Sequence, residues 1–108
     1  MWGVKCDLHQ DIRLVKAGKF QTRDDFQHQR QCNPEMQLIV NLGNPLYLQL
    51  QELRYVIDTK DWFLIPTGIP FFAYQPTTGG CVFYWLHFQT QSPCPQIDET
   101  QALEQLLL

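Results

Sequence analysis

The sequence has few of the residues on which catalysis and nucleic-acid binding usually depend. Ser92 is its only serine, and its three histidines include no His-x-His pair. Lys and Arg number eight, none of them after Lys60, and the formal net charge is -3. Because phosphate binding needs a clustered basic face, this chain is not expected to bind nucleic acid by itself.

Long apolar runs and paired cysteines are also missing. The longest uncharged run, residues 62–97, is interrupted by five prolines and by Gly79-Gly80, so no membrane helix of ~20 apolar residues is expected. The N-terminus, MWGVKCDLHQ, has mixed charge and does not resemble a secretory signal. The four cysteines show no Cys-x-x-Cys spacing. We therefore expect four free thiols and a cytoplasmic protein.

Aromatic residues are what the sequence has in quantity. They make up 13% of 108 residues, a length that suits one domain with a modest core. Many gather in residues 60–88, where apolar runs are separated by proline and glycine. Such a stretch fits either a packed core or a pocket that stacks on a ligand.

Short apolar runs with turn residues between them predict strands. Leu46, Leu48 and Leu50 alternate with polar glutamines, which is the period of a half-buried strand. A strand ending in a turn at Ala17-Gly18 is expected near Ile12. The other expected strands are residues 36–42, 46–51, 53–57, 62–65, 71–74 and 82–88. This spacing predicts an all-β fold with a closed or sandwiched antiparallel sheet.

The last twelve residues have a different pattern. Acidic residues follow Ile97, as in the first turn of a helix, and Leu103, Leu106 and Leu107 recur at helical spacing. We therefore expect a C-terminal helix from residue 97 and a chain cut from a longer protein. The apolar stripe on this helix predicts at least weak self-association.

Three motifs carry a resemblance to a known family. Gly43 ends one strand, Asp61-Trp62-Phe63-Leu64-Ile65-Pro66-Thr67-Gly68 gives a strand and a Pro-x-Gly turn, and Trp85-Leu86-His87-Phe88 lies in the last long strand. In this order they resemble the N-terminal domain of AraC-type transcription regulators, which is a cupin: a double-stranded β-helix, or jelly-roll barrel. The resemblance covers roughly residues 30–88, and Lys60 stands where the family commonly has glycine.

The resemblance implies a function and a domain organisation. Residues 1–96 would form the effector-binding cupin domain, and residues 97–108 the start of a helical linker or dimerisation segment. Such a domain senses a small molecule, often a sugar, and usually forms a homodimer in a bacterial regulator. A helix-turn-helix domain, absent from this chain, would read DNA.

Cupin enzymes suggest a different activity, because they hold a metal with a His-x-His pair, a Glu and a later His. This chain has no such pair, and Phe71 stands three residues after Gly68, at the position of the last ligand. Since metals need several converging imidazole or carboxylate ligands, we expect no metal, no other cofactor and no enzymatic activity. The acidic pairs Asp24-Asp25 and Asp58/Asp61 are expected to be solvated.

Candidate ligand-binding residues follow from the strand period and the family. Alternation places Phe83, Trp85 and His87 on one face of their strand. In the arabinose-binding member of the family a tryptophan at the position of Trp85 stacks on the sugar, which implies the same role here, with His87 as a hydrogen-bonding neighbour. Arg30 resembles an arginine that reaches sugar hydroxyls. Phe71 and Tyr74 are further candidates for lining the pocket. The alternative is that Trp85 and His87 fill a closed core.

Two other functions remain open from the sequence. One is a stand-alone carbohydrate-binding cupin with no DNA-binding partner domain. The other is an enzyme with a metal site that the pattern does not reveal. Two helix-turn-helix motifs encoded beyond Leu108 would distinguish the regulator from the stand-alone protein. Metal analysis of the purified protein would decide whether it is an enzyme with such a metal site.

Overall fold

The computed structural model describes residues 2–4, 12–90 and 96–98. All the regular secondary structure within these ranges consists of β-strands. Within them, no helix is long and apolar enough to cross a membrane. The strands are β1 (Trp2–Val4), β2 (Ile12–Thr22), β3 (Met36–Asn41), β4 (Leu46–Leu50), β5 (Leu53–Ile57), β6 (Trp62–Ile65), β7 (Phe71–Ala73), β8 (Cys81–Thr90) and β9 (Gln96–Asp98). The expectation of an all-β fold is confirmed.

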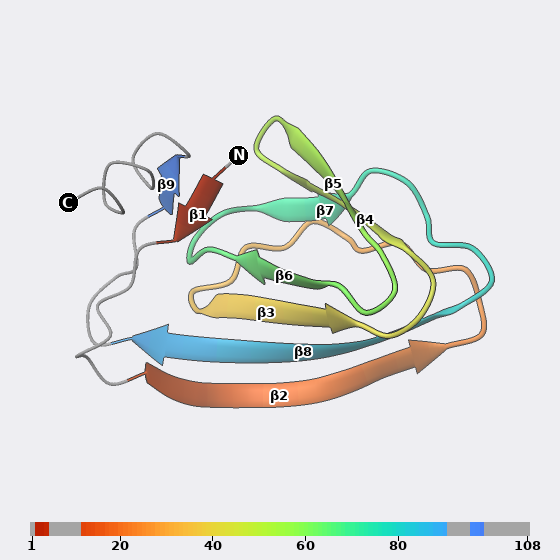
Figure 1. The fold of residues 1–108 in the computed structure, drawn as a ribbon, viewed down its shortest axis with the longest axis horizontal. Helices are drawn as coiled ribbons and strands as arrows, with labels where there is room; N and C mark the ends of the chain where they lie inside the picture. The colour runs from red at the N-terminus through yellow and green to blue at the C-terminus, as the bar shows by residue number, and fades with distance from the viewer. Residues whose placement is uncertain (1, 5–11, 91–95, 99–108) are drawn as a thin grey trace.

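Two antiparallel sheets form the body of the fold (Figure 1). The larger sheet has the strand order β2-β8-β3-β6, and the smaller has the order β5-β4-β7. A third pair, β1 and β9, forms a two-stranded sheet of its own. Neighbours in the two large sheets are mostly far apart in sequence, as in a jelly roll.

The core lies between the two large sheets. In β4 the leucines are buried, while Tyr47 and Gln49 are half-buried, so the alternation seen in the sequence faces the core as expected. The buried apolar cluster draws on both sheets; its members are Ile39, Leu46, Leu48, Leu50, Ile57, Ile65, Phe71, Ala73, Cys81 and Phe83. The expected closed or sandwiched arrangement is therefore present.

The predicted turn at Ala17-Gly18 is wrong, because β2 continues through both residues to Thr22. Gly18 lies opposite Trp85 of β8. A side chain at position 18 would collide with the indole, so the glycine serves close packing between neighbouring strands rather than a turn.

The expected helix start at Ile97 is also wrong. Residues 96–98 form β9, which pairs antiparallel with β1 in the register Trp2↔Asp98, Gly3↔Ile97 and Val4↔Gln96. Residues 96–98 are extended because they pair with β1, more than ninety positions earlier in the chain. The local pattern of acidic residues and leucines carries no information about that pairing. Leu103, Leu106 and Leu107 lie outside the described residues.

The turn between β5 and β6 explains one departure from the family pattern. Lys60 has a φ of 73°, in the left-handed region that favours glycine. Its backbone N–H donates to the Asn41 carbonyl at 2.7 Å, and the Asp58 N–H donates to Asp61 Oδ2 at 3.1 Å. The position therefore has the backbone geometry that a glycine would adopt without strain.

Candidate functional site

A cavity of about 410 Å³ opens beside the inward face of the larger sheet. Strands β2, β3 and β8 and the segment before β3 all contribute side chains to it. Its aromatic lining consists of Phe20, Phe26, Phe83 and Trp85, and its polar lining of Lys16, His28, Gln31, Asn33, Gln37 and His87. We call it the Trp85 cavity. Its volume lies within the roughly 300–1,000 Å³ that is usual for small-molecule sites.

Strand β8 places Trp85 and His87 on the same face, as the alternation predicts. Their ring centroids are 5.5 Å apart and the rings are nearly perpendicular, at 82°. Trp85 is half-buried, whereas His87 is only 7% exposed. Across the sheet, His87 lies between Lys16 of β2 and Gln37 of β3. The result is an aromatic surface with polar groups along one edge.

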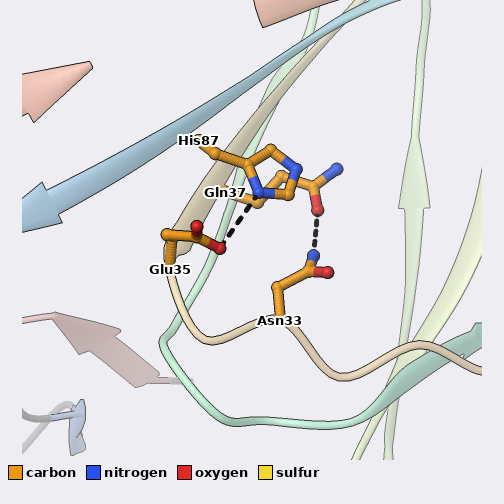
Figure 2. Close-up of polar contacts among 4 residues, drawn as sticks. All are labelled: Asn33, Glu35, Gln37 and His87. Carbon is orange, nitrogen blue, oxygen red and sulfur yellow. Dashed lines mark hydrogen bonds and ion pairs between the residues drawn. The ribbon is translucent and has the colours of Figure 1, made fainter. Parts of the chain in front are cut away.

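Three residues of the polar lining, Asn33, Gln37 and His87, lie close to Glu35, which is not itself part of the lining (Figure 2). The Asn33 amide Nδ2 donates a short hydrogen bond to Gln37 Oε1, which fixes the orientation of both carboxamides. The Glu35 carboxylate points at His87, with Oε2 3.6 Å from Nδ1. That separation is too long for a hydrogen bond. His87 Nδ1 is buried and has no hydrogen-bond partner among the described residues.

An unpaired buried nitrogen is costly, about 1–3 kcal/mol, and most such groups in proteins have a partner. A bound molecule or an ordered water beside His87 would remove this cost. The imidazole is thus the group in the cavity with the clearest unused capacity for a hydrogen bond.

The opposite side of the cavity is an aromatic cluster around His28. The His28 ring centroid lies 4.9 Å from that of Phe26 and 5.3 Å from that of Phe83. Phe20 packs against Phe26 at 4.5 Å. Burial in this apolar setting lowers the pKa of His28 to about 4, so its imidazole is neutral at pH 7.

The structure brings together three of the six candidate residues: Phe83, Trp85 and His87 all line the cavity. The other three lie elsewhere. Phe71 is fully buried in the core between the sheets. Tyr74 packs against Tyr47, with ring centroids 5.9 Å apart. Arg30 is exposed and lines a separate hollow with Phe72.

The Arg30 hollow is larger, at about 590 Å³, but its polar residues are mainly exposed side chains from one stretch, residues 27–30. The Trp85 cavity instead brings the buried side chains of Gln37 on β3 and His87 on β8 next to an aromatic surface. Convergent polar groups in an apolar setting are typical of ligand sites, so the Trp85 cavity is the candidate.

Sequence reasoning missed much of the polar lining, namely Lys16, His28, Gln31, Asn33 and Gln37. Residues 26–31 have no period, yet their backbone pairs with β7 through Gln31↔Phe71 and with the segment after β7 through Phe26↔Thr77. This places His28 beside the barrel interior. The one available signal was Gln37, a polar residue that is buried on the inward face of β3 next to Ile39.

No protein-family model and no curated protein sequence matches this chain. Solved structures do match. A cupin domain from Bordetella pertussis Tohama I has a TM-score of 0.54 and 14% identity, and the match covers 82% of this chain and 92% of that one. The Schizosaccharomyces pombe Cnp3 cupin domain has a TM-score of 0.57 and 7% identity, covering 99% and 70%. The fold is a cupin fold.

A third match is a conserved protein of unknown function from Streptococcus pyogenes, with a TM-score of 0.60, 12% identity, and coverage of 78% of this chain and 77% of that one. At such identities the likeness shows the fold alone. The matches to cupin domains confirm the cupin part of the resemblance. None of the three proteins is described as an AraC-type regulator, so the regulator function stays a proposal.

The residues that the structure describes do not form a metal centre of the kind that cupin enzymes use. Among the described residues, no group of three or more His, Cys, Asp or Glu side chains is placed to hold a metal ion. In the cavity, His87 has Glu35 nearby, but His28 is packed among phenylalanine rings. A phenyl ring at position 71 offers no donor.

The described cysteines do not add a reactive centre to the cavity. Cys32 is an exposed free thiol and Cys81 is a buried one. Burial raises the pKa of the Cys81 thiol, which favours the unreactive protonated form. Neither residue lines the Trp85 cavity, and Cys6 and Cys94 lie outside the described residues.

Proposed function

We propose that this cupin domain binds a small, uncharged, sugar-like molecule in the Trp85 cavity. The observation that carries the proposal is the pair Trp85 and His87: a half-buried indole beside a buried imidazole whose Nδ1 has no hydrogen-bond partner among the described residues. Sugars suit this arrangement, since their C–H faces stack on aromatic rings while their hydroxyls need oriented polar groups.

The charges around the cavity favour a neutral ligand. Gln31, Asn33 and Gln37 are carboxamides, which donate and accept hydrogen bonds without carrying charge. His28 is neutral at pH 7 because burial holds its pKa at about 4. Lys16 is the one Lys or Arg residue in the lining, and the Glu35 carboxylate lies near His87. An anionic ligand would therefore have a single lysine beside it and a carboxylate nearby, which is poor compensation for its desolvation.

The wider proposal is that this domain is the effector-sensing and dimerisation part of a cytoplasmic, bacterial AraC-type transcription regulator. It is supported by the order of the motifs at residues 61–68 and 85–88 and by the cupin fold. In such a protein, DNA contact would belong to a helix-turn-helix domain outside this chain. Two helix-turn-helix motifs encoded downstream would support this reading, and their absence would favour a stand-alone carbohydrate-binding cupin.

A thermal-shift screen tests the binding proposal. The panel should contain neutral monosaccharides and polyols together with their acidic counterparts, such as aldonic and uronic acids. A ligand at 100 times its dissociation constant adds about 2.7 kcal/mol to the free energy of unfolding. For a domain of this size that corresponds to roughly 10–20 °C in Tm. Shifts with neutral members alone are the expected result, and shifts confined to the acids would contradict the neutral cavity.

A further inference from the structure

One buried side chain, that of His28, borders two spaces. It lines the Trp85 cavity, and it also lines the Arg30 hollow. The residue is only 8% exposed, because the Phe83 ring lies 5.3 Å from the imidazole and the Phe71 ring 6.1 Å, between centroids. The Trp85 cavity and the Arg30 hollow are therefore neighbours that share one wall.

The backbone on both sides of this wall is tied to β7. The Ala73 N–H donates to the His28 carbonyl at 3.0 Å, and the Gln27 carboxamide Nε2 donates to the Ala73 carbonyl at 3.1 Å. Further along the segment, the backbones of Gln31 and Phe71 exchange two hydrogen bonds of 2.9 Å. The segment is thus held like a further strand beside β7. A wall with a fixed position reduces the ordering that a ligand must impose when it binds.

The Arg30 hollow repeats the chemistry of the Trp85 cavity. Its aromatic residue is the half-buried Phe72 of β7, and its polar lining consists of Gln27, His28, Gln29 and Arg30. Carboxamides donate and accept hydrogen bonds, and a guanidinium presents several donors in one plane, which serve neutral hydroxyls as well as anions. An aromatic ring with such groups beside it is what a sugar unit needs.

A third hollow continues beyond Phe72. It has a volume of about 260 Å³, and Arg30, Gln51, Pro70 and Phe72 line it. Arg30 and Phe72 line both hollows, so they lie between them as His28 lies between the Arg30 hollow and the cavity. Three neighbouring spaces, each lined by an aromatic residue, suit a chain of sugar units better than a single unit.

We propose that the ligand is a neutral oligosaccharide of at least two units, with one unit in the Trp85 cavity and the next beside Phe72 in the Arg30 hollow. The proposal rests on the proposed function, because the first unit is the sugar that stacks on Trp85. His28 then lies at the junction of the two units. Its imidazole is neutral at pH 7, so one ring nitrogen donates and the other accepts a hydrogen bond.

A comparison of ligand lengths tests the proposal. Isothermal titration calorimetry of the whole chain should use glucose, galactose, mannose and xylose, and then the neutral disaccharides lactose, cellobiose, maltose, mannobiose and xylobiose. We expect a disaccharide to bind about tenfold or more tightly than either monosaccharide that it contains, because the second unit adds contacts in the Arg30 hollow.

Two substitutions locate the second unit. Phe72→Leu removes the flat ring and keeps most of the volume, and Arg30→Ala removes an exposed guanidinium. Both should weaken disaccharide binding about tenfold and leave monosaccharide binding unchanged. Phe88→Leu and Arg13→Ala are the matched controls, because Phe88 is also half-buried, Arg13 is also exposed, and neither lines the cavity or the Arg30 hollow. The controls should bind both ligands as the wild type does.

The possible failures are distinguishable. Equal affinity for a monosaccharide and for every disaccharide that contains it would overturn the two-unit ligand and leave the proposed function standing. A preference for a disaccharide that neither Phe72→Leu nor Arg30→Ala reduces, in variants with native circular-dichroism spectra, would overturn it in the same way. Binding of no saccharide at all would contradict the proposed function, and the two-unit ligand with it.

Discussion

The indole of Trp85 lies over Gly18 of the neighbouring strand, in space that any other residue at position 18 would occupy. A Cβ added to Gly18 would lie 2.7 Å from the Trp85 atom Cε2 and 3.1 Å from Cη2. Real Cβ contacts of 2.7 Å are essentially never seen, so the ring would have to move. The glycine therefore determines where the aromatic surface of the cavity lies.

Replacing Gly18 by valine should displace the indole and weaken ligand binding more than tenfold. Overpacking of this kind costs ~1–3 kcal/mol of stability, which leaves a folded domain for measurement. Ala17→Val is the control, because Ala17 is adjacent, exposed and directed away from the cavity. Near-ultraviolet circular dichroism reports the environment of the indole. An unchanged spectrum in Gly18→Val would show that the ring does not depend on the glycine.

Lys60→Gly should stabilise the domain by roughly 0.5–1 kcal/mol. Lys60 has a φ of 73° and is exposed, so a glycine relieves left-handed strain without removing a buried contact. Lys60→Ala keeps the strain and should give no gain. Denaturant unfolding of both variants measures the difference, and equal stability of the glycine and alanine variants would refute the strain argument.

His28 should make the domain less stable in mild acid. Burial lowers its pKa from the ordinary value of 6.5 to about 4, so between these pH values the unfolded chain takes up a proton that the folded chain does not. The stability is fully present above about pH 6.5 and is lost as the pH falls toward 4. The expected loss is about 3 kcal/mol.

The measurement is the free energy of unfolding of the wild type and of His28→Phe from pH 7 to pH 4. Carboxylates titrate in both proteins, so the difference between the two curves isolates His28. The variant should show a shallower decline over this window. Parallel curves would mean that the buried imidazole is not responsible for the acid sensitivity.

The fold was largely predictable because its signals are local. The leucines of β4 alternate with Tyr47 and Gln49, and Gly43 and Pro45 mark the turn between β3 and β4, so strand positions could be predicted from residues a few positions apart. The errors arose where distant segments decide the structure. From the sequence, Gly18 resembles a turn residue, but in the structure it is a strand residue opposite Trp85. Residues 96–98 resemble a helix start, but they form a strand because they pair with β1.

The candidate site was predictable only where it lies on a regular strand. Phe83, Trp85 and His87 share a face because β8 is a regular strand, and alternation alone gives that result. Arg30, Phe71 and Tyr74 were proposed from resemblance or aromatic character, and the structure places them outside the cavity. His28 and Asn33 lie on an irregular segment whose course depends on its pairing with β7, for which the sequence carries no periodic signal.

The central claim is that the Trp85 cavity holds a neutral, sugar-like ligand, and isothermal titration calorimetry of one conservative variant tests it most directly. Once the screen has identified a ligand, its affinity should be measured for the wild type, Trp85→Phe and Trp62→Phe. Both substitutions exchange an indole for a phenyl ring, but Trp62 is 69% exposed on the outer face of the sheet. We expect Trp85→Phe to raise the dissociation constant about tenfold or more and Trp62→Phe to leave it unchanged. Equal affinity in all three proteins, each with a native circular-dichroism spectrum, would contradict the account.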